Sequence, residues 1–160
     1  MAVWSYAFPL DRLVLALKFH ARLSLAPFFA HGLAASLAAQ TAEFDAIVPM
    51  PLHRGRIAER GFNQALEIAR PLARALRRPL LARGVERTRA TAAQTELDPD
   101  GRRRNVRGAF RCGPGFAGRR IAVLDDVMTT GSTLEEFARV LKRAGVLEVT
   151  NLVVARTVQR

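Results

Sequence analysis

The sequence has 160 residues, of which 49% are hydrophobic and 24% charged, as expected for one globular domain. Charged residues interrupt every long apolar stretch, and Cys112 is the only cysteine, which excludes a membrane span, an internal disulfide and a multi-thiolate zinc site. The formal net charge is +11, and arginine far outnumbers lysine, which favours anionic partners, although a GC-rich genome would also explain the arginine-to-lysine ratio.

The first half of the chain alternates between helical and strand-like patterns. A short apolar segment ends at Pro49 and Pro51 and is followed by the polar sequence LHRGRIAERG, which predicts a buried strand leading into a functional loop. Pro71 predicts a kink or a break in the helical pattern that follows. The predicted elements are helices over residues 9–20, 25–39 and 62–76 and a strand over residues 44–48.

The second half has the same alternation, interrupted by one long irregular segment. Residues 87–104 have no sustained period and are too long for an ordinary connection, so they predict a mobile functional lid or a disordered segment. The other predicted elements are strands over residues 80–85, 106–112, 120–124 and 149–155 and a helix over residues 133–144. This order predicts a single α/β domain over residues 1–160, with a mostly parallel central sheet flanked by helices.

The most informative segment is VLDDVMTTGSTL, residues 123–134. Two carboxylates, Asp125 and Asp126, follow a buried strand at the edge where open α/β sheets bind ligands. The next residues offer backbone N–H groups and hydroxyls at a helix N-terminus, a typical phosphate site. The predicted phosphate loop consists of Thr129, Thr130, Gly131, Ser132 and Thr133.

A phosphate in this loop beside a vicinal diol at the acids describes a ribose 5-phosphate. Carboxylates accept hydrogen bonds from ribose hydroxyls, whereas they would repel a phosphate. Two alternatives remain. Thr130 and Ser132 are also common helix-capping residues. The acids are also compatible with the Mg²⁺ site of a receiver or phosphatase domain, but those domains place their acids on an early strand and need later catalytic Asp or Lys residues that this chain lacks.

The same segment resembles the phosphoribosyl pyrophosphate signature of the type I phosphoribosyltransferases. Residues 48–70, VPMPLHRGRIAERGFNQALEIAR, are similar to the segment that marks the ComF family of competence-associated proteins in this class. RTRATAAQTELDPDGRRRNVRGAF, residues 87–110, resembles the central loop of that family, and YAFPLDRLVLALKF resembles its opening helix. The resemblance spans nearly the whole chain, but the cysteine-rich zinc module that often begins longer members is absent.

The resemblance implies a type I phosphoribosyltransferase-like fold and assigns roles to three groups of residues. Asp125 and Asp126 would bind the ribose, hold Mg²⁺ through its bound water, and orient the reacting sugar. Asn63 would cap a helix or contact ligand. The implied pyrophosphate-binding residues are Pro51, Leu52, His53, Arg54 and Arg60, with Arg56 adding charge, and the implied contacts from a flexible loop over residues 87–107 are Thr91, Gln94, Arg103, Arg104 and Asn105.

The implied reaction is displacement of pyrophosphate from the ribose anomeric carbon by an unidentified acceptor, with Mg²⁺ as cofactor. A non-catalytic alternative is an accessory of DNA uptake that holds single-stranded DNA on its basic surface and senses nucleotides. Competence machinery proteins and a second copy of the chain are further candidate partners. A cytoplasmic location is expected, because the first residues do not form a signal peptide.

Overall fold

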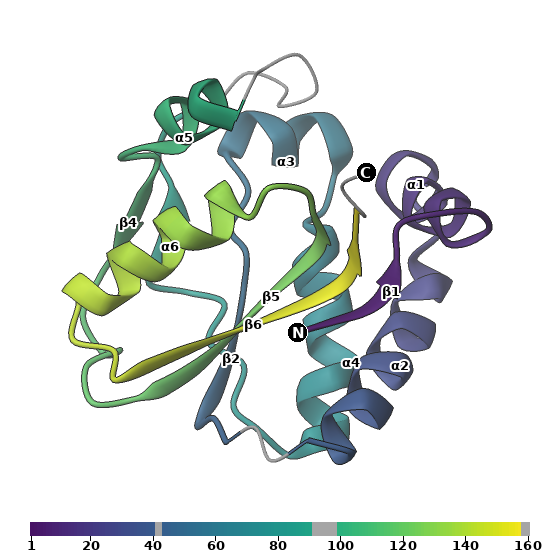
Figure 1. Cartoon of the computed structure of the whole chain (residues 1–160), viewed down its shortest axis with the longest axis horizontal. Helices are drawn as coiled ribbons and strands as arrows, with labels where there is room; N and C mark the ends of the chain where they lie inside the picture. The colour runs from purple at the N-terminus through teal and green to yellow at the C-terminus, as the bar shows by residue number, and fades with distance from the viewer. Residues whose placement is uncertain (41–42, 91–98, 158–160) are drawn as a thin grey trace.

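The computed structural model describes residues 1–40, 43–90 and 99–157, and its centre is a four-stranded parallel sheet (Figure 1). The strand order is β1-β6-β5-β2, and all three neighbouring pairs are parallel. The strands are β1 (Ala2–Ser5), β2 (Ala46–Pro49), β5 (Arg120–Met128) and β6 (Glu148–Arg156). A separate antiparallel pair joins β3 (Val85–Arg87) to β4 (Phe110–Cys112).

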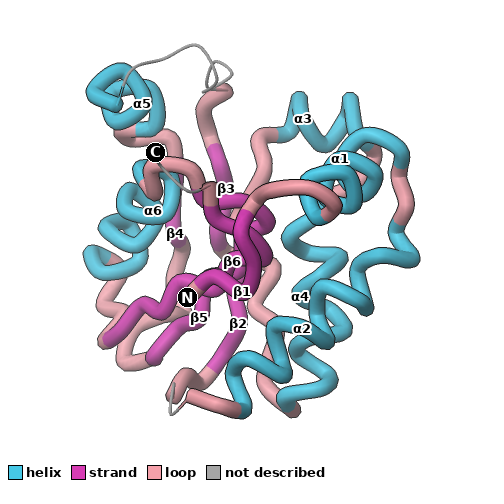
Figure 2. The backbone as a smooth tube through the Cα atoms, turned by 45° about the vertical axis from the view of Figure 1, so that its right-hand side comes forward, coloured by secondary structure: helices cyan, strands magenta, loops and turns pink. Residues whose placement is uncertain are grey.

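Helices cover both faces of the sheet (Figure 2). One face packs against α1 (Leu10–His20), α2 (Ala26–Ala38) and α4 (Gln64–Leu76), with a short 3₁₀ turn over Leu23–Leu25 between the first two helices. The other face packs against α6 (Ser132–Arg143) and β4. Two short helices, α3 (Arg54–Arg60) and α5 (Pro99–Val106), lie at the carboxyl edge of the strands in Figure 1.

The side chains of β5 alternate between the hydrophobic clusters on the two faces of the sheet. Ala122 and Leu124 are buried among α1, α2 and α4, whereas Ile121 and Val123 are buried on the α6 side, because successive side chains of a strand point to opposite faces. A strand that is buried on both faces has the continuous apolar sequence seen here. The α/β class with a parallel sheet flanked by helices is therefore confirmed.

The helix predicted over residues 62–76 is one continuous element, α4, so Pro71 does not break it. Asn63 caps α4: its side-chain oxygen accepts from the backbone N–H groups of Ala65 and Leu66 at 2.9 and 3.3 Å. Capping was one of two readings of Asn63, and the structure confirms it. The cost of the proline inside the helix is offset by burial of neighbouring side chains such as Ile68 and Leu72, both fully buried.

The polar sequence after β2 contains a helix that its composition did not predict. His53 caps α3 through Nδ1, which accepts from the Gly55 N–H at 3.2 Å, and Gly61 ends the helix with a φ of 84°. No residue of α3 is buried, so its sequence carries no apolar stripe and its end signals are the only local evidence for it.

Three strand predictions also need correction. The segment predicted as a strand over residues 80–85 contributes only a bridge from Leu80 to Ile47, and β3 begins at its last residue. The strand predicted over residues 106–112 is shortened to β4, because α5 continues to Val106 and so occupies part of the segment predicted as an irregular lid. β1 was not predicted: it is a short strand at the sheet edge, and its partner β6 lies at the other end of the chain.

Within the described ranges, no helix combines the length and the apolar character that crossing a bilayer would require.

Candidate functional site

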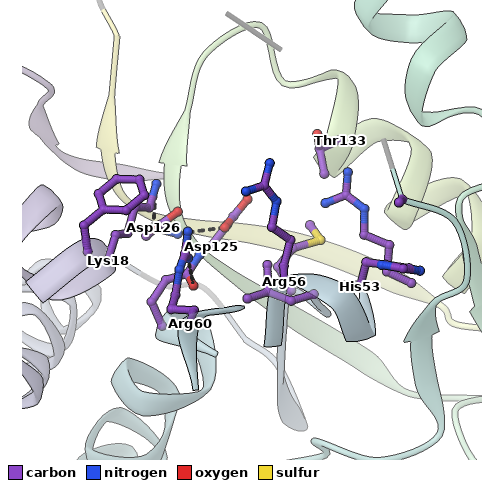
Figure 3. A pocket seen from close by; sticks show the side chains of 13 residues that line it. Lys18, His53, Arg56, Arg60, Asp125, Asp126 and Thr133 are labelled. Carbon is purple, nitrogen blue, oxygen red and sulfur yellow. Dashed lines mark hydrogen bonds and ion pairs between the residues drawn. The ribbon is translucent and has the colours of Figure 1, made fainter. Parts of the chain in front are cut away.

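A cavity of about 310 Å³ lies at the carboxyl edge of the sheet, beside the carboxyl ends of β5 and β2 (Figure 3). Such a volume is at the lower end of the range for small-molecule sites. α1, α3, β3 and β5 all contribute side chains to it. Its charged and titratable lining residues are Lys18, His53, Arg56, Arg60, Arg87, Asp125 and Asp126, and Phe19, Met50, Leu52, Gln64, Ala90 and Thr133 complete the wall.

The two adjacent acids lie within β5, which continues its pairing with β6 to Met128 rather than ending at Leu124. Each carboxylate accepts a local backbone hydrogen bond: Asp125 from the Asp126 N–H at 2.9 Å, and Asp126 from the Val127 N–H at 2.8 Å. These bonds fix both side chains relative to the strand before any ligand is present.

Lys18 forms an ion pair with Asp126, with 2.8 Å between Nζ and Oδ2 (Figure 3). The side chain of Asp126 is only 5% exposed and that of Lys18 is 20% exposed, so little solvent screens the pair. Burial by itself would lower the pKa of Lys18, but the charges of Asp126 and Asp125 outweigh it, and the pKa lies above its usual value. Lys18 therefore remains protonated beside Asp126.

The surroundings of Asp125 disfavour the charged form of its carboxyl group. Burial and the negative charge of Asp126 raise the pKa of Asp125, and Lys18 only partly offsets them. A diol or a cation that contacts Asp125 would stabilise its charged form.

The loop after β5 forms a second, smaller hollow of about 30 Å³, and Thr133 and Asp125 line both it and the main cavity. Gly131 stands at the N-cap position of α6 with a φ of 84° and gives the helix no side-chain cap. Thr130 and Ser132 contact each other through their hydroxyls at 3.0 Å. Neither Thr130 nor Ser132 occupies the N-cap position of α6, and no side chain caps the helix. The first turn of α6 therefore faces a hollow suited to an anion.

A wall of cations stands across the cavity from this loop (Figure 3). Arg56 and Arg60 extend from α3; Arg60 donates to the buried Gln64, and its guanidinium lies 5.3 Å from the centre of the Phe19 ring. Arg87 at the end of β3 stacks on Phe110 at 5.4 Å. Burial lowers the pKa of both Arg60 and Arg87, an effect that nearby Asp126 and Asp125 respectively oppose, so both guanidinium groups stay charged in a partly dehydrated wall.

The predicted pyrophosphate residues divide into two groups. Leu52, His53 and Arg60 line the cavity, and so does Arg56, whereas Pro51 is buried beneath the wall and Arg54 is exposed outside it. The Nδ1 atom of His53 is occupied by its capping bond. Three of the four predicted basic residues, His53, Arg56 and Arg60, therefore line the cavity.

Of the predicted flexible-loop contacts, only Arg104 and Asn105 have described side chains, and neither lines the cavity. Thr91 and Gln94 lie outside the described residues, and Arg103 belongs to α5. Arg104 lines a separate hollow against α6, and the main-chain oxygen of Asn105 accepts a hydrogen bond from Arg89 at 2.8 Å. The phosphate-loop residues Thr129, Gly131, Ser132 and Thr133 line the small hollow, next to Thr130.

Sequence reasoning did not identify Lys18, Phe19 or Arg87 as site residues. Lys18 is one of only two lysines in an arginine-rich chain, which was a usable signal. Arg87 reaches the cavity because its backbone bridges to that of His53, a contact between segments that no local pattern predicts.

The site offers a divalent cation two carboxylates and no more. No group of three or more His, Cys, Asp or Glu side chains that could hold a metal is present among the residues that the structure describes. Mg²⁺ typically binds through one or two carboxylates, ligand phosphates and retained waters, so Asp125 and Asp126 fit a Mg²⁺ that arrives with a phosphorylated ligand.

The chain is similar to a known domain family and to two named relatives. Residues 58–160 match the phosphoribosyl transferase domain family. The chain is 38% identical over 162 residues to the DNA utilization protein YhgH of Escherichia coli strain K12, covering 98% of this chain and 71% of YhgH. It is 41% identical over 108 residues to competence protein F of Haemophilus influenzae, covering 66% of this chain and 47% of that protein.

Among solved structures, the glutamine phosphoribosylpyrophosphate amidotransferase of B. subtilis is similar in fold, with a TM-score of 0.56 and 20% identity over 82% of this chain. The matched region is 26% of that much longer chain. The likeness at this identity concerns the fold alone. Together with the family match and the two relatives, it establishes that the chain belongs to the ComF family of type I phosphoribosyltransferase-like proteins.

Proposed function

We propose that the cavity binds phosphoribosyl pyrophosphate together with Mg²⁺ and that the protein transfers the phosphoribosyl group to an acceptor with release of pyrophosphate. The observation that carries the proposal is the order of groups across the site. Asp125 lines both the small hollow in the loop after β5 and the main cavity, and Arg56, Arg60 and Arg87 line the main cavity. A ribose 5-phosphate with a pyrophosphate on its anomeric carbon carries its groups in this order.

The residues have distinct chemical tasks in this reaction. The N–H groups of the loop through Gly131 and Thr133 bind the 5-phosphate. Asp125 and Asp126 accept hydrogen bonds from the ribose hydroxyls and orient the ring. Asp125 and Asp126 would hold Mg²⁺ in the loaded site, where the ion would supply positive charge to the departing pyrophosphate. The guanidinium groups of Arg56 and Arg87 stabilise the negative charge that grows on pyrophosphate as the bond to the anomeric carbon breaks.

Titration calorimetry with phosphoribosyl pyrophosphate, with and without Mg²⁺, tests the proposal. We expect metal-dependent binding by the wild type and at least tenfold weaker binding by an Asp125→Asn/Asp126→Asn double variant. Asp11→Asn/Glu148→Gln is the matched control, since it removes two negative charges from residues that line neither hollow. A folded wild type that gives no heat with the ligand and Mg²⁺ contradicts the proposal.

A second candidate function is the holding of single-stranded DNA. The net charge of +11 favours it, and two relatives carry the names DNA utilization protein and competence protein F. Fluorescence anisotropy with a labelled single-stranded oligonucleotide tests this candidate. Binding that weakens steeply with added salt supports it, and the absence of binding at low ionic strength removes it.

A further inference from the structure

A second hollow lies along α4, away from the candidate active site. Its volume is about 760 Å³. α4 begins at Gln64, which lines the active-site cavity, whereas the hollow follows the helix from Leu66 to Arg77 and shares no lining residue with that cavity. Figure 1 shows α4 running from beneath α3 to the opposite edge of the sheet.

Five exposed arginines line this hollow, and none of its ten lining residues is acidic. The arginines are Arg70, Arg74, Arg77, Arg78 and Arg83. Among the described residues, Arg70 has Glu67 at 3.7 Å, but no carboxylate lies within ion-pair distance of the other four. By contrast, Arg56, Arg111, Arg120 and Arg139 elsewhere on the surface each have an acidic partner.

Stabilisation of α4 does not explain this concentration of charge. One cation near a helix C-terminus is enough to interact favourably with the helix dipole, and further cations repel one another. Arg74 already stands in the last turn. The remaining arginines therefore add repulsion to the folded protein unless an anion compensates it.

The backbone at Arg77 supports a ligand-binding role. Arg77 ends α4 with a φ of 51°, in the left-handed region where glycine is the favoured residue. An arginine at this position costs stability relative to glycine, and strained positions of this kind gather at binding sites. The strain places one more guanidinium group at the hollow.

The hollow also has apolar lining residues. Leu66, Pro79 and Leu80 line it together with the arginines. A ligand that matches both surfaces combines a flat or apolar part with several phosphate oxygens. Planar guanidinium groups bind such oxygens two at a time, and a volume of this size lies within the range for a small-molecule site.

We infer that this hollow is a second site, which binds a nucleoside polyphosphate directly through arginine and without Mg²⁺. The base lies against Leu66 and Leu80, and the phosphates lie among Arg74, Arg77 and Arg83. No carboxylate lines the hollow to hold a metal ion, so binding persists when metal is removed. This separates the site from the metal-dependent site proposed for phosphoribosyl pyrophosphate.

The test is titration calorimetry with ATP in the presence of EDTA, using the wild type and an Arg77→Gly/Arg83→Gln variant. Glycine suits the backbone at position 77, so the variant is expected to fold. Arg111→Gln/Arg119→Gln is the control, because it removes the same two charges from exposed positions outside the hollow. We expect at least tenfold weaker ATP binding for the first variant and less than a twofold change for the control.

Three further ligands identify the source of any binding. We expect inorganic triphosphate to bind at least tenfold more weakly than ATP, phosphoribosyl pyrophosphate with EDTA not to displace ATP, and a thymidine oligonucleotide not to bind more tightly than ATP. Equal weakening of ATP binding in both arginine variants overturns the inference, because it shows only general attraction to positive charge. Displacement of ATP by phosphoribosyl pyrophosphate, or binding of the oligonucleotide alone, also overturns it.

Discussion

The electrostatic environment of Asp126 depends on Lys18, a residue far away in the sequence. The pattern of residues 123–134 grouped it with Asp125 as a ribose ligand, and both acids do line the cavity. The structure adds Lys18, whose ammonium group pairs with Asp126 in a poorly solvated position. Any ligand that contacts Asp126 must share the carboxylate with Lys18 or displace it.

Replacing Lys18 with methionine tests the strength of this pair. The substitution leaves a carboxylate that is 5% exposed without its cation, so we expect the free energy of unfolding to fall by about 2 kcal/mol or more. Urea denaturation measures the change. Lys142→Met is the control at the only other lysine, which is exposed, and it should change stability by less than about 0.5 kcal/mol. Equal effects of the two substitutions would show that the pair contributes no stability.

Asp125 leads to a prediction about pH. Burial and Asp126 raise the pKa of Asp125 to about 8, from an ordinary value of 3.8. Between these two values the folded protein keeps a proton that the unfolded chain releases, so this group makes the free energy of unfolding fall as pH rises. Asp125→Asn cannot titrate, so its stability should depend less on pH in this window. Urea denaturation of both proteins across the window measures the difference, and parallel curves contradict the raised pKa.

At the scale of secondary-structure elements, the N-terminal caps of α3 and α4 position residues that line the site. His53 begins α3 and Asn63 begins α4, so both helices start where the chain leaves the carboxyl edge of the sheet. The Asn63 side chain also donates to the Met50 main-chain oxygen at 3.0 Å, which ties α4 to the segment after β2. On the other face of the sheet, the buried Glu136 of α6 accepts from the Gly108 N–H at 2.7 Å and anchors the end of the central segment.

Asn63→Ala and Asn63→Asp separate the two bonds of this side chain. Alanine removes the cap of α4 and the bond to Met50, so we expect a loss of about 1 to 2 kcal/mol in the free energy of unfolding. Aspartate keeps a capping oxygen and loses only the bond to Met50, so it should recover part of the loss. Thermal and urea denaturation provide the comparison, and an alanine variant as stable as the wild type would show that the cap is dispensable.

For the whole molecule, the net charge of +11 is the dominant electrostatic property. Repulsion within a compact state of this charge weakens folding, and salt screens it. We expect the midpoint of thermal unfolding to rise as sodium chloride is increased from about 0.02 M to about 0.3 M. Sulfate at equal ionic strength should raise it further, since it also binds guanidinium groups. A midpoint that falls with salt would show that favourable ion pairs outweigh the repulsion.

Apolar runs and helical spacing among neighbouring residues were sufficient to predict several of the strands and helices. The apolar run over residues 120–124 predicted the core of β5, and helical spacing predicted α1, α2, α4 and α6. The acids and the loop through Gly131 were placed at the correct edge of the sheet by their position after a buried strand. α3 and α5 were missed, because most of their residues are charged or polar and neither helix has an apolar stripe.

By itself, the sequence determined the α/β order, the phosphate loop beside two acids and the excess of positive charge, because periodicity, turn chemistry and composition are properties of neighbouring residues. Only the tertiary structure decided that Lys18 pairs with Asp126, that Arg87 lies beside His53, and that five arginines surround one hollow. These arrangements depend on contacts between distant segments. They form only when packing of the helices against the sheet provides the free energy that brings those segments together.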